Sequence, residues 1–372
     1  MIEVDDQPTL QLRTMLATLG VDSRSLAASP SGTIKPPPSR PRSQDDAFID
    51  ALPTFDVVSE GQPGGDLTLG SLIGEGGMGV VLQARQVPLH RDVAVKRSRS
   101  TRNDDDMTLA LLREAWITGG LEHPNIVPVH TLGRDAAGAP MFVMKRIDGV
   151  AWSALIRDPT LHPRGATGDP LGMHLDILQQ VCNAVAFAHS RGILHRDLKP
   201  DNVMVGAFGE VYLLDWGLAL ALKPREGLRL PLAADFKGIA GTPHYMAPEM
   251  VVGDGSQFDE RTDVFLLGAL LHEVLTGRPR NGGRTAMEVL ACAWRASPYD
   301  YGEGIAADLG AICNRACSGK SELRHASADA FRAAIDEFME FLPVLSFDGY
   351  GMAQLKAEDV IDYLTRGISS SM

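Results

Sequence analysis

The stretch ILHRDLKPDNVMV, Ile193–Val205, decides how the rest of this sequence is interpreted. It places a carboxylate (Asp197), a cation (Lys199) and an amide (Asn202) in a short segment stiffened by a proline. Transfer of a phosphoryl group needs a carboxylate to orient a hydroxyl and accept its proton, a cation beside the transferred phosphate, and an oxygen ligand for a metal ion. The spacing therefore indicates phosphoryl-transfer chemistry.

A second oxygen ligand follows in YLLDWG, Tyr212–Gly217, where Asp215 ends an apolar run. Carboxylate and amide oxygens are the ligands that Mg²⁺ prefers in proteins. We therefore expect Asn202 and Asp215 to bind Mg²⁺, with Mn²⁺ as an alternative.

A glycine-rich stretch, GEGGMGVV, spans Gly74–Val81. In a dinucleotide-binding fold such glycines open a helix, with an acidic residue about 20 positions further on. Here a β-branched alternating run follows instead, which favours a strand, a turn and a second strand laid over phosphates. Taken alone, the motif is equally compatible with a glycine-rich hairpin that binds nothing.

The run VAVK ends at Lys96, a cation at the end of an apolar strand that needs a partner near the core. Glu114, in LLREAW on the helix expected next, is the candidate partner. A surface lysine and a solvated glutamate would be the simpler interpretation if either motif stood alone.

Taken together, GEGGMG, LEHPNIVPVH and HRDLKPDN resemble the bacterial branch of the eukaryotic-like (Hanks-type) serine/threonine protein kinases over residues 67–342. The resemblance implies an α+β, protein-kinase-like fold, with a small N-lobe β-sheet carrying one helix and a mainly helical C-lobe. It also implies ATP and Mg²⁺ as the nucleotide and the metal, with Asp197 as the catalytic base and Lys199 and Lys96 as further catalytic residues.

The same resemblance assigns fifteen positions to the nucleotide site, from the glycine-rich loop to the metal ligands. Met144 falls at the gatekeeper position, and the backbone of Lys145 and Ile147 is expected to meet adenine. The full set is Gly74, Glu75, Gly76, Gly77, Met78, Gly79, Val81, Ala94, Lys96, Glu114, Met144, Lys145, Ile147, Asn202 and Asp215.

By the same resemblance, other positions have structural roles or indicate the acceptor. Arg324 is expected to pair with Glu249, and Asp263 to brace the catalytic loop. Lys199 and Thr242, the latter in GTPHYMAPE, favour Ser/Thr over Tyr as the acceptor.

The segment Leu218–Gly241 contains no Ser, Thr or Tyr. In other members of the family, the corresponding segment commonly carries a regulatory phosphate. Arg196 would normally pair with that phosphate, so we expect a substitute. Asp235 is our first choice, because a carboxylate can form the bidentate pair that a phosphate would form. The alternatives are Glu226 and the packing of apolar side chains, namely Leu228, Leu230, Leu232 and Phe236. Trp216 replaces the usual Phe of the metal-binding motif and is expected to fill the same apolar position.

Outside the kinase-like region we expect a short helix over 1–20, a Pro/Ser-rich disordered linker over 21–66 and an unassigned tail over 343–372. The kinase-like region divides into an N-lobe, 67–147, and a C-lobe, 148–342. Hydroxyls in the linker are candidate autophosphorylation sites: Ser23, Ser25, Ser29, Ser31, Thr33, Ser39 and Ser43.

The formal charge of −12 argues against a nucleic-acid partner, because phosphate neutralisation needs clustered Lys and Arg. The sequence has no uninterrupted apolar run long enough to cross a membrane, and its four cysteines show no paired spacing. We therefore expect a cytoplasmic protein with free thiols; the sequence leaves its oligomeric state open.

These features predict an ATP-dependent protein kinase that phosphorylates Ser/Thr hydroxyls of protein substrates and also itself. The alternative is a pseudokinase or scaffold that keeps the fold without turnover. Degenerate members usually lose the lysine, the base or a metal ligand, and here all are present. A kinase of small molecules is disfavoured by the intact GTPHYMAPE segment.

Overall fold

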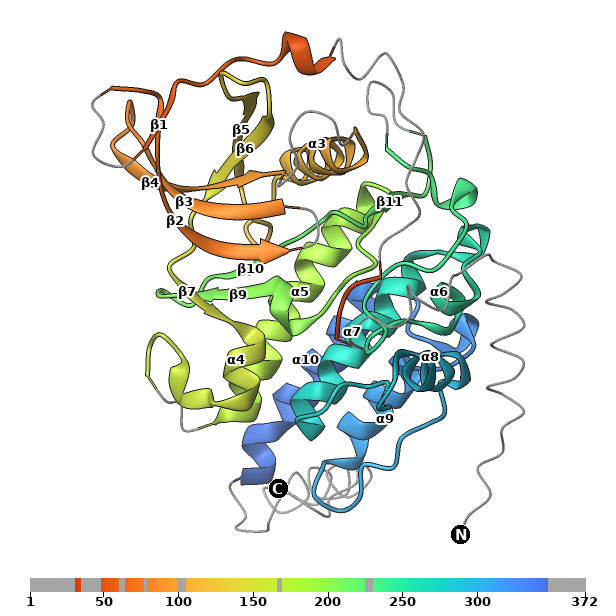
Figure 1. Ribbon diagram of the computed structural model, residues 1–372. Helices are drawn as coiled ribbons and strands as arrows, with labels where there is room; N and C mark the ends of the chain where they lie inside the picture. The colour runs from red at the N-terminus through yellow and green to blue at the C-terminus, as the bar shows by residue number, and fades with distance from the viewer. Residues whose placement is uncertain are drawn as a thin grey trace.

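The computed structural model describes residues 31–34, 48–59, 64–76, 79–98, 105–165, 169–224 and 230–346. The chain forms two lobes, a sheet with one helix above and a larger helical lobe below (Figure 1). This is the protein-kinase-like architecture that the motifs predict.

The N-lobe is built on a six-stranded sheet of order β1-β2-β3-β4-β6-β5. Its apolar face is packed with side chains that alternate along the strands, so that Val93 and Val95 point into the core while Ala94 and Lys96 point to the opposite face. The strands are β1 (Val57–Ser59), β2 (Leu67–Gly76), β3 (Gly79–Gln86), β4 (Arg91–Arg97), β5 (Val129–Arg134) and β6 (Pro140–Lys145).

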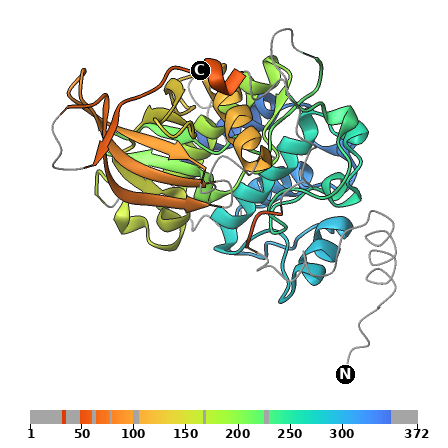
Figure 2. The same ribbon diagram turned by 45° about the horizontal axis from the view of Figure 1, so that its top comes forward.

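Helix α3 (Asp105–Gly119) covers the other face of this sheet (Figure 2), where Leu111 and Ala115 pack on Phe142. Lys96 and Phe142 are cross-strand neighbours on β4 and β6. The side chain of Lys96 therefore starts from the sheet face that α3 covers.

The sheet begins earlier in the chain than the motifs predict. The short strand β1 pairs in parallel with β2, and Phe55 donates its N–H to the carbonyl of Arg134 at 2.8 Å. The Phe55 ring packs so closely on Gly133 that a Cβ there would lie 2.4 Å from it. The prediction of a disordered linker is therefore wrong for residues 48–59, because their few apolar side chains pack on the edge of the sheet.

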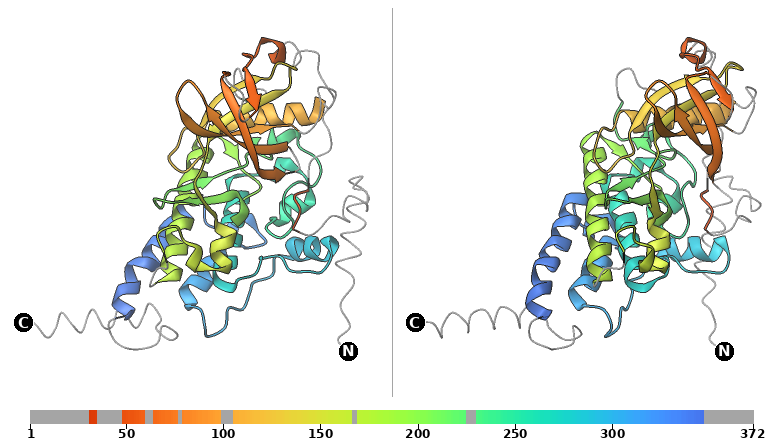
Figure 3. Two further views of the ribbon diagram at one scale, coloured as in Figure 1. Left: turned by 60° about the vertical axis from the view of Figure 1, so that its left-hand side comes forward. Right: turned by 90° about the vertical axis from the view of Figure 1, so that its left-hand side faces the viewer.

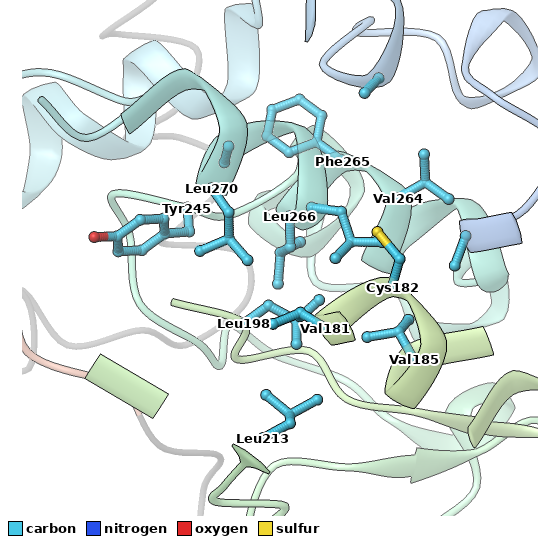
Figure 4. Close-up of a cluster of buried hydrophobic side chains, with 14 of the residues drawn as sticks. Val181, Cys182, Val185, Leu198, Leu213, Tyr245, Val264, Phe265, Leu266 and Leu270 are labelled. Carbon is cyan, nitrogen blue, oxygen red and sulfur yellow. The ribbon is translucent and has the colours of Figure 1, made fainter. Parts of the chain in front are cut away.

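The C-lobe surrounds two apolar helices, α5 (Pro170–Ser190) and α7 (Glu260–Thr276). Figure 4 shows their side chains interlocking, with Leu198 of the catalytic segment and Leu213 entering the same cluster. Helix α7 ends at Gly277 in the left-handed conformation (φ 67°), as predicted from the sequence.

The remaining helices of the C-lobe are arranged around this pair. They are α4 (Trp152–Arg157), α6 (Pro248–Val252), α8 (Ala286–Arg295), α9 (Ala307–Ala316) and α10 (Ala328–Ser346), with 3₁₀ turns η2 (Pro159–Leu161), η3 (Pro200–Asn202), η4 (Ala233–Asp235), η5 (Gly255–Gln257) and η6 (Ser321–Leu323). Helix α10 lies along α5 (Figure 3) and continues past the predicted boundary at residue 342. The predicted helix over 1–20 and residues 347–372 of the tail lie outside the described residues.

Two small sheets flank the catalytic segment, with β8 (Ile193–Leu194) directly before it and β9 (Val203–Gly206) directly after it in the chain. One has the order β10-β9-β7, from β7 (Gly149–Ala151), β9 (Val203–Gly206) and β10 (Val211–Leu213). In the other, β8 (Ile193–Leu194) pairs antiparallel with β11 (Leu220–Ala221), so the segment after Asp215 runs back beside the start of the catalytic loop.

Candidate active site

The catalytic loop is held by a single buried carboxylate, that of Asp263 on α7. It accepts hydrogen bonds from the backbone N–H groups of His195 (2.8 Å) and Arg196 (2.9 Å), and its Oδ2 lies 2.9 Å from His189 Nε2. Burial alone would raise the pKa of Asp263, but the hydrogen bond and charge of His189 outweigh it and lower the pKa. The predicted bracing role of Asp263 is confirmed. The brace supports an Arg196 backbone in the left-handed region (φ 68°).

Asp197 follows on this loop, and polar groups from two segments converge on it. Lys199 Nζ lies 3.1 Å from Asp197 Oδ2, and the hydroxyl of Thr242 donates to Oδ1 at 2.7 Å. Asn202 Nδ2 donates to the Asp197 carbonyl at 2.9 Å. The carboxylate, cation and amide predicted from the sequence therefore form one cluster, and Thr242 fixes the carboxylate.

Lys96 connects the two lobes. Its Nζ lies 2.5 and 2.7 Å from the two carboxylate oxygens of Glu114 on α3, and 3.8 Å from Asp215 Oδ1. Burial lowers the pKa of a lysine, but here the carboxylates of Glu114 and Asp215 outweigh it and raise the pKa. Burial raises the pKa of Glu114 to about 7 against the opposing charge of Lys96, so this carboxylate depends on its lysine to stay ionised. The predicted ion pair is formed.

The predicted metal ligands have the chemistry that a divalent cation needs. Asp215 adopts a left-handed backbone (φ 59°) and keeps 42% of its side chain exposed. Desolvation opposes its ionisation, but the charges of Lys96 and Lys199 outweigh it and lower the pKa of the carboxyl. The amide nitrogen of Asn202 is taken by the loop, so its oxygen is the atom left for a cation. Both residues therefore offer oxygen donors that fit Mg²⁺.

The glycine-rich stretch is a β-hairpin, with Gly74 opposite Val81 and Gly76 opposite Gly79. This confirms a strand on each side of the motif and excludes the helix of a dinucleotide-binding fold. A Cβ on Gly79 would lie 2.2 Å from the carbonyl oxygen of Arg97, so no side chain fits at that position. Gly77 and Met78 lie outside the described residues.

Comparison with known proteins agrees with this geometry. A sequence profile described as the protein kinase domain matches residues 67–296. The chain belongs to the protein kinase family. It is 33% identical over 290 residues to the serine/threonine-protein kinase PknD of Chlamydia abortus. This alignment covers 73% of the chain and 31% of that relative.

Two mycobacterial relatives are similar at a comparable level. The serine/threonine-protein kinases PknB of Mycobacterium leprae and Mycobacterium tuberculosis are 36% and 35% identical over 272 and 273 residues, covering 71% of this chain. These alignments cover 42% and 41% of the relatives, so the chain spans less than half of their length. In the part of the chain that the structure describes, none of the helices is both long and apolar enough to cross a membrane.

The positions that the family uses for adenine lie at the junction of the lobes. Ala94 is buried opposite Met144 on neighbouring strands. The N–H of Lys145 donates to the carbonyl of Pro128 at 2.9 Å, so this amide is already engaged within the protein. Ile147 follows in the connection to the C-lobe and is half-buried.

Met204 is a candidate nucleotide contact that the sequence analysis missed. Its neighbours Val203 and Val205 point into the C-lobe core, so Met204 points to the other face of β9. Its cross-strand partner there, Tyr212, accepts a hydrogen bond from Lys145 Nζ at 2.5 Å, which places this face toward the connection between the lobes. The alternation within VMV was the signal that could have identified it.

Arg196 is held without the carboxylate that we expected. Its guanidinium lies over the rings of Phe236 and Phe258, at 4.1 and 4.9 Å from their centroids, and its Nη1 donates to the Leu218 carbonyl at 3.2 Å. Asp235 is exposed and forms no ion pair with Arg196 in the described part of the chain. The prediction of an Asp235 pair is therefore wrong; packing of Phe236, one of the alternatives, is what the structure contains. Glu226 and Leu228 lie outside the described residues.

The predicted pair of Arg324 with Glu249 is confirmed. Arg324 forms a bidentate pair with Glu249, at 2.7 and 2.8 Å. Trp216 is fully buried in the C-lobe core, with its ring 4.5 Å from that of His195. The metal-binding motif is thus packed directly against the catalytic loop.

Proposed function

We propose that this protein is an ATP-dependent protein serine/threonine kinase, which transfers the γ-phosphate of ATP to Ser/Thr hydroxyls of proteins. The observation that carries the proposal is the convergence of Lys96, Asp197, Asn202 and Asp215 from separate segments at the junction of the lobes. The formed Lys96–Glu114 pair supports turnover over a pseudokinase, because no member of the constellation is missing or displaced.

In this proposal each residue has a defined task. Lys96, held by Glu114, positions the phosphates, and the Gly74–Gly79 hairpin covers them. Asn202 and Asp215 hold Mg²⁺, which neutralises charge on the phosphates when bound. Asp197 orients the acceptor hydroxyl and takes its proton, and Lys199 balances negative charge beside it.

The finer assignments rest on the sequence together with the geometry. Thr242 and Lys199 both contact Asp197, which supports Ser/Thr as the acceptor. We propose Mg²⁺ as the metal with Mn²⁺ as an alternative, a kinase domain over 67–342, and protein substrates in the cytoplasm. The net charge of −12 supports the absence of a nucleic-acid partner.

The test is phosphate transfer by the purified full-length chain, with Mg²⁺, labelled ATP and myelin basic protein as a generic acceptor. Asp197→Asn is the matched variant, because it keeps the shape of the side chain and removes the base. We expect it to lower the transfer rate by on the order of 10²-fold or more. Equal label with wild type and Asp197→Asn, or none with wild type, would contradict the proposal.

A further inference from the structure

A short segment from far upstream in the chain occupies the acceptor side of the active site. Residues 31–34, drawn in dark red beside α6 and α7 in Figure 1, run next to the segment that precedes Thr242. Ile34 and Gly241 form an antiparallel bridge, in which Ile34 N–H donates to the Gly241 carbonyl (2.7 Å) and Gly241 N–H donates to the Ile34 carbonyl (2.8 Å). The Ile34 side chain packs on the C-lobe core. The segment is therefore held by its backbone and by an apolar anchor.

This bridge places the hydroxyl of Thr33 on the catalytic residues. Thr33 Oγ1 donates to Asp197 Oδ2 at 3.3 Å and accepts from Lys199 Nζ at 2.7 Å. It also lies 2.9 Å from the hydroxyl of Thr242. A base must lie within hydrogen-bond reach of the proton that it removes, and Thr33 is placed in this way beside Asp197.

The backbone of Gly241 is adapted to this pairing. It has a φ of 130°, and a Cβ there would lie 2.8 Å from Met250 Cε and 3.2 Å from the carbonyl oxygen of Arg196. A side chain at this position would therefore disturb the backbone of Gly241, which forms the bridge with Ile34. Residues 31–34 therefore bind directly to the catalytic loop and to the activation segment.

We propose that Thr33 is the phosphoacceptor of an intramolecular autophosphorylation, and that residues 31–34 are a substrate segment bound in cis. The inference rests on the proposed function and adds its acceptor. Thr33 Oγ1 attacks the γ-phosphorus of ATP, and a new oxygen–phosphorus bond forms. The bond from that phosphorus to the β,γ-bridging oxygen breaks, with ADP leaving with the electron pair, and the hydroxyl proton passes to Asp197.

Two consequences follow from the way the segment is seated. While unmodified Thr33 contacts Asp197 and Lys199, no other hydroxyl can take the same position. The residue after the acceptor is apolar and packs on the C-lobe, so substrates with Thr or Ser followed by an apolar residue fit the same seat. Because the segment belongs to the same chain, its effective concentration is high and does not depend on the protein concentration.

The first experiment locates the phosphate. Full-length wild type, Thr33→Val, Thr33→Ser and Ser31→Ala are incubated with Mg²⁺ and ATP, and the sites are identified by phosphopeptide mass spectrometry. We expect nearly one phosphate per chain at position 33 in wild type, Ser31→Ala and Thr33→Ser, and none there in Thr33→Val. Ser31 is the matched control, because it is exposed and lies on the same segment. An active wild type with position 33 unmodified would overturn the proposal.

The second experiment separates cis from trans transfer. Unlabelled wild type is mixed with an isotope-labelled Asp197→Asn chain, whose Thr33 can be phosphorylated only by another molecule. We expect the phosphate at Thr33 on wild type alone, at a rate per molecule that is constant over a tenfold dilution. Equal phosphate on the labelled chain, or a rate per molecule that falls with dilution, would overturn the intramolecular assignment.

Myelin basic protein in the same reactions distinguishes this proposal from the proposed function. If wild type phosphorylates this acceptor and Thr33 stays unmodified, the kinase assignment stands and the segment is not a substrate. If neither is phosphorylated, the kinase assignment itself fails and the inference fails with it.

Discussion

Two fully buried arginines anchor the activation segment in different ways. Arg324 forms a bidentate pair with Glu249, at the end of that segment. Arg196 instead lies over two aromatic rings, those of Phe236 and Phe258, and its Nε and Nη2 have no hydrogen-bond partner in the described part of the chain. One buried cation is paired directly with a carboxylate. The other lies against the faces of aromatic rings, and the nearby charges of Asp263 and Asp197 favour its ionised form without forming an ion pair with it.

The difference shows what contacts Arg196 in a segment that has no phosphorylatable hydroxyl. Burial lowers the pKa of Arg196 to about 10, which still leaves the guanidinium charged at neutral pH. Phe236 lies over that charge and β11 pairs with β8, and these contacts hold the described parts of the segment, residues 218–224 and 230–241, beside Arg196. In the described part of Leu218–Gly241, a stretch that lacks Ser, Thr and Tyr, the Phe236 ring is therefore found at Arg196 where we expected a carboxylate.

The largest effect is expected where the carboxylate partner is removed. Glu249→Ala leaves Arg324 buried without a counter-charge, and breaking such a pair typically costs about 3–5 kcal/mol of unfolding free energy. Urea-induced unfolding followed by circular dichroism measures it. Glu249→Gln is the matched control and is expected to lose less, because it keeps hydrogen-bond acceptors for Arg324. A loss below about 1 kcal/mol in Glu249→Ala would show that the two arginines do not differ in this way.

A smaller effect is expected at the aromatic anchor. Phe236→Leu keeps an apolar side chain and removes the ring, so the loss is the cation–π contact, about 2 kcal/mol or less at a desolvated site. The same unfolding measurement is combined with the rate of phosphate transfer to myelin basic protein, because Arg196 adjoins Asp197, the proposed base.

Phe236→Tyr is the control for this variant, since it keeps the ring over the guanidinium. We expect Phe236→Tyr to remain close to wild type in both measurements. If Phe236→Leu were indistinguishable from Phe236→Tyr, the ring would not be what holds Arg196.

Much of the candidate active site could be predicted from the sequence, because each of its residues belongs to a short motif in which the residue type indicates the partner it needs. Lys96 needs a counter-charge near the core, and Glu114 is the residue that the next helix offers. Asp263 and the pair of Arg324 with Glu249 were likewise recognised by resemblance, and each is found with the expected partner.

The parts that were missed depend on contacts between segments distant in sequence. Phe258 lies well beyond the activation segment, and no local pattern indicates that its ring packs on Arg196. Residues 31–34 and 48–59 lie in polar, proline-rich surroundings whose composition predicts disorder. Yet Ile34 bridges to Gly241, and Val57–Ser59 pair with β2 of the N-lobe sheet. Pairing of this kind depends on the partner surface, which local composition does not encode.

The smallest expected effect concerns the carboxylate that the sequence favoured for Arg196. Asp235 is exposed on η4, next to Phe236, and surface substitutions away from special contacts usually change stability by within about 0.5 kcal/mol. We expect Asp235→Asn to match wild type both in urea unfolding and in phosphate transfer at low ionic strength, where any charge interaction would be strongest. Lys237→Gln is a control on the same surface, because it removes a charge that does have a partner, Asp254, at 2.5 Å. The contrary result has two parts: Asp235→Asn loses phosphate transfer severalfold, and high salt lowers the transfer rate of wild type by the same factor. Arg196 would then exchange its aromatic contacts for Asp235 during catalysis. The distinction between the two arginines would then describe one state of the kinase and not its working cycle.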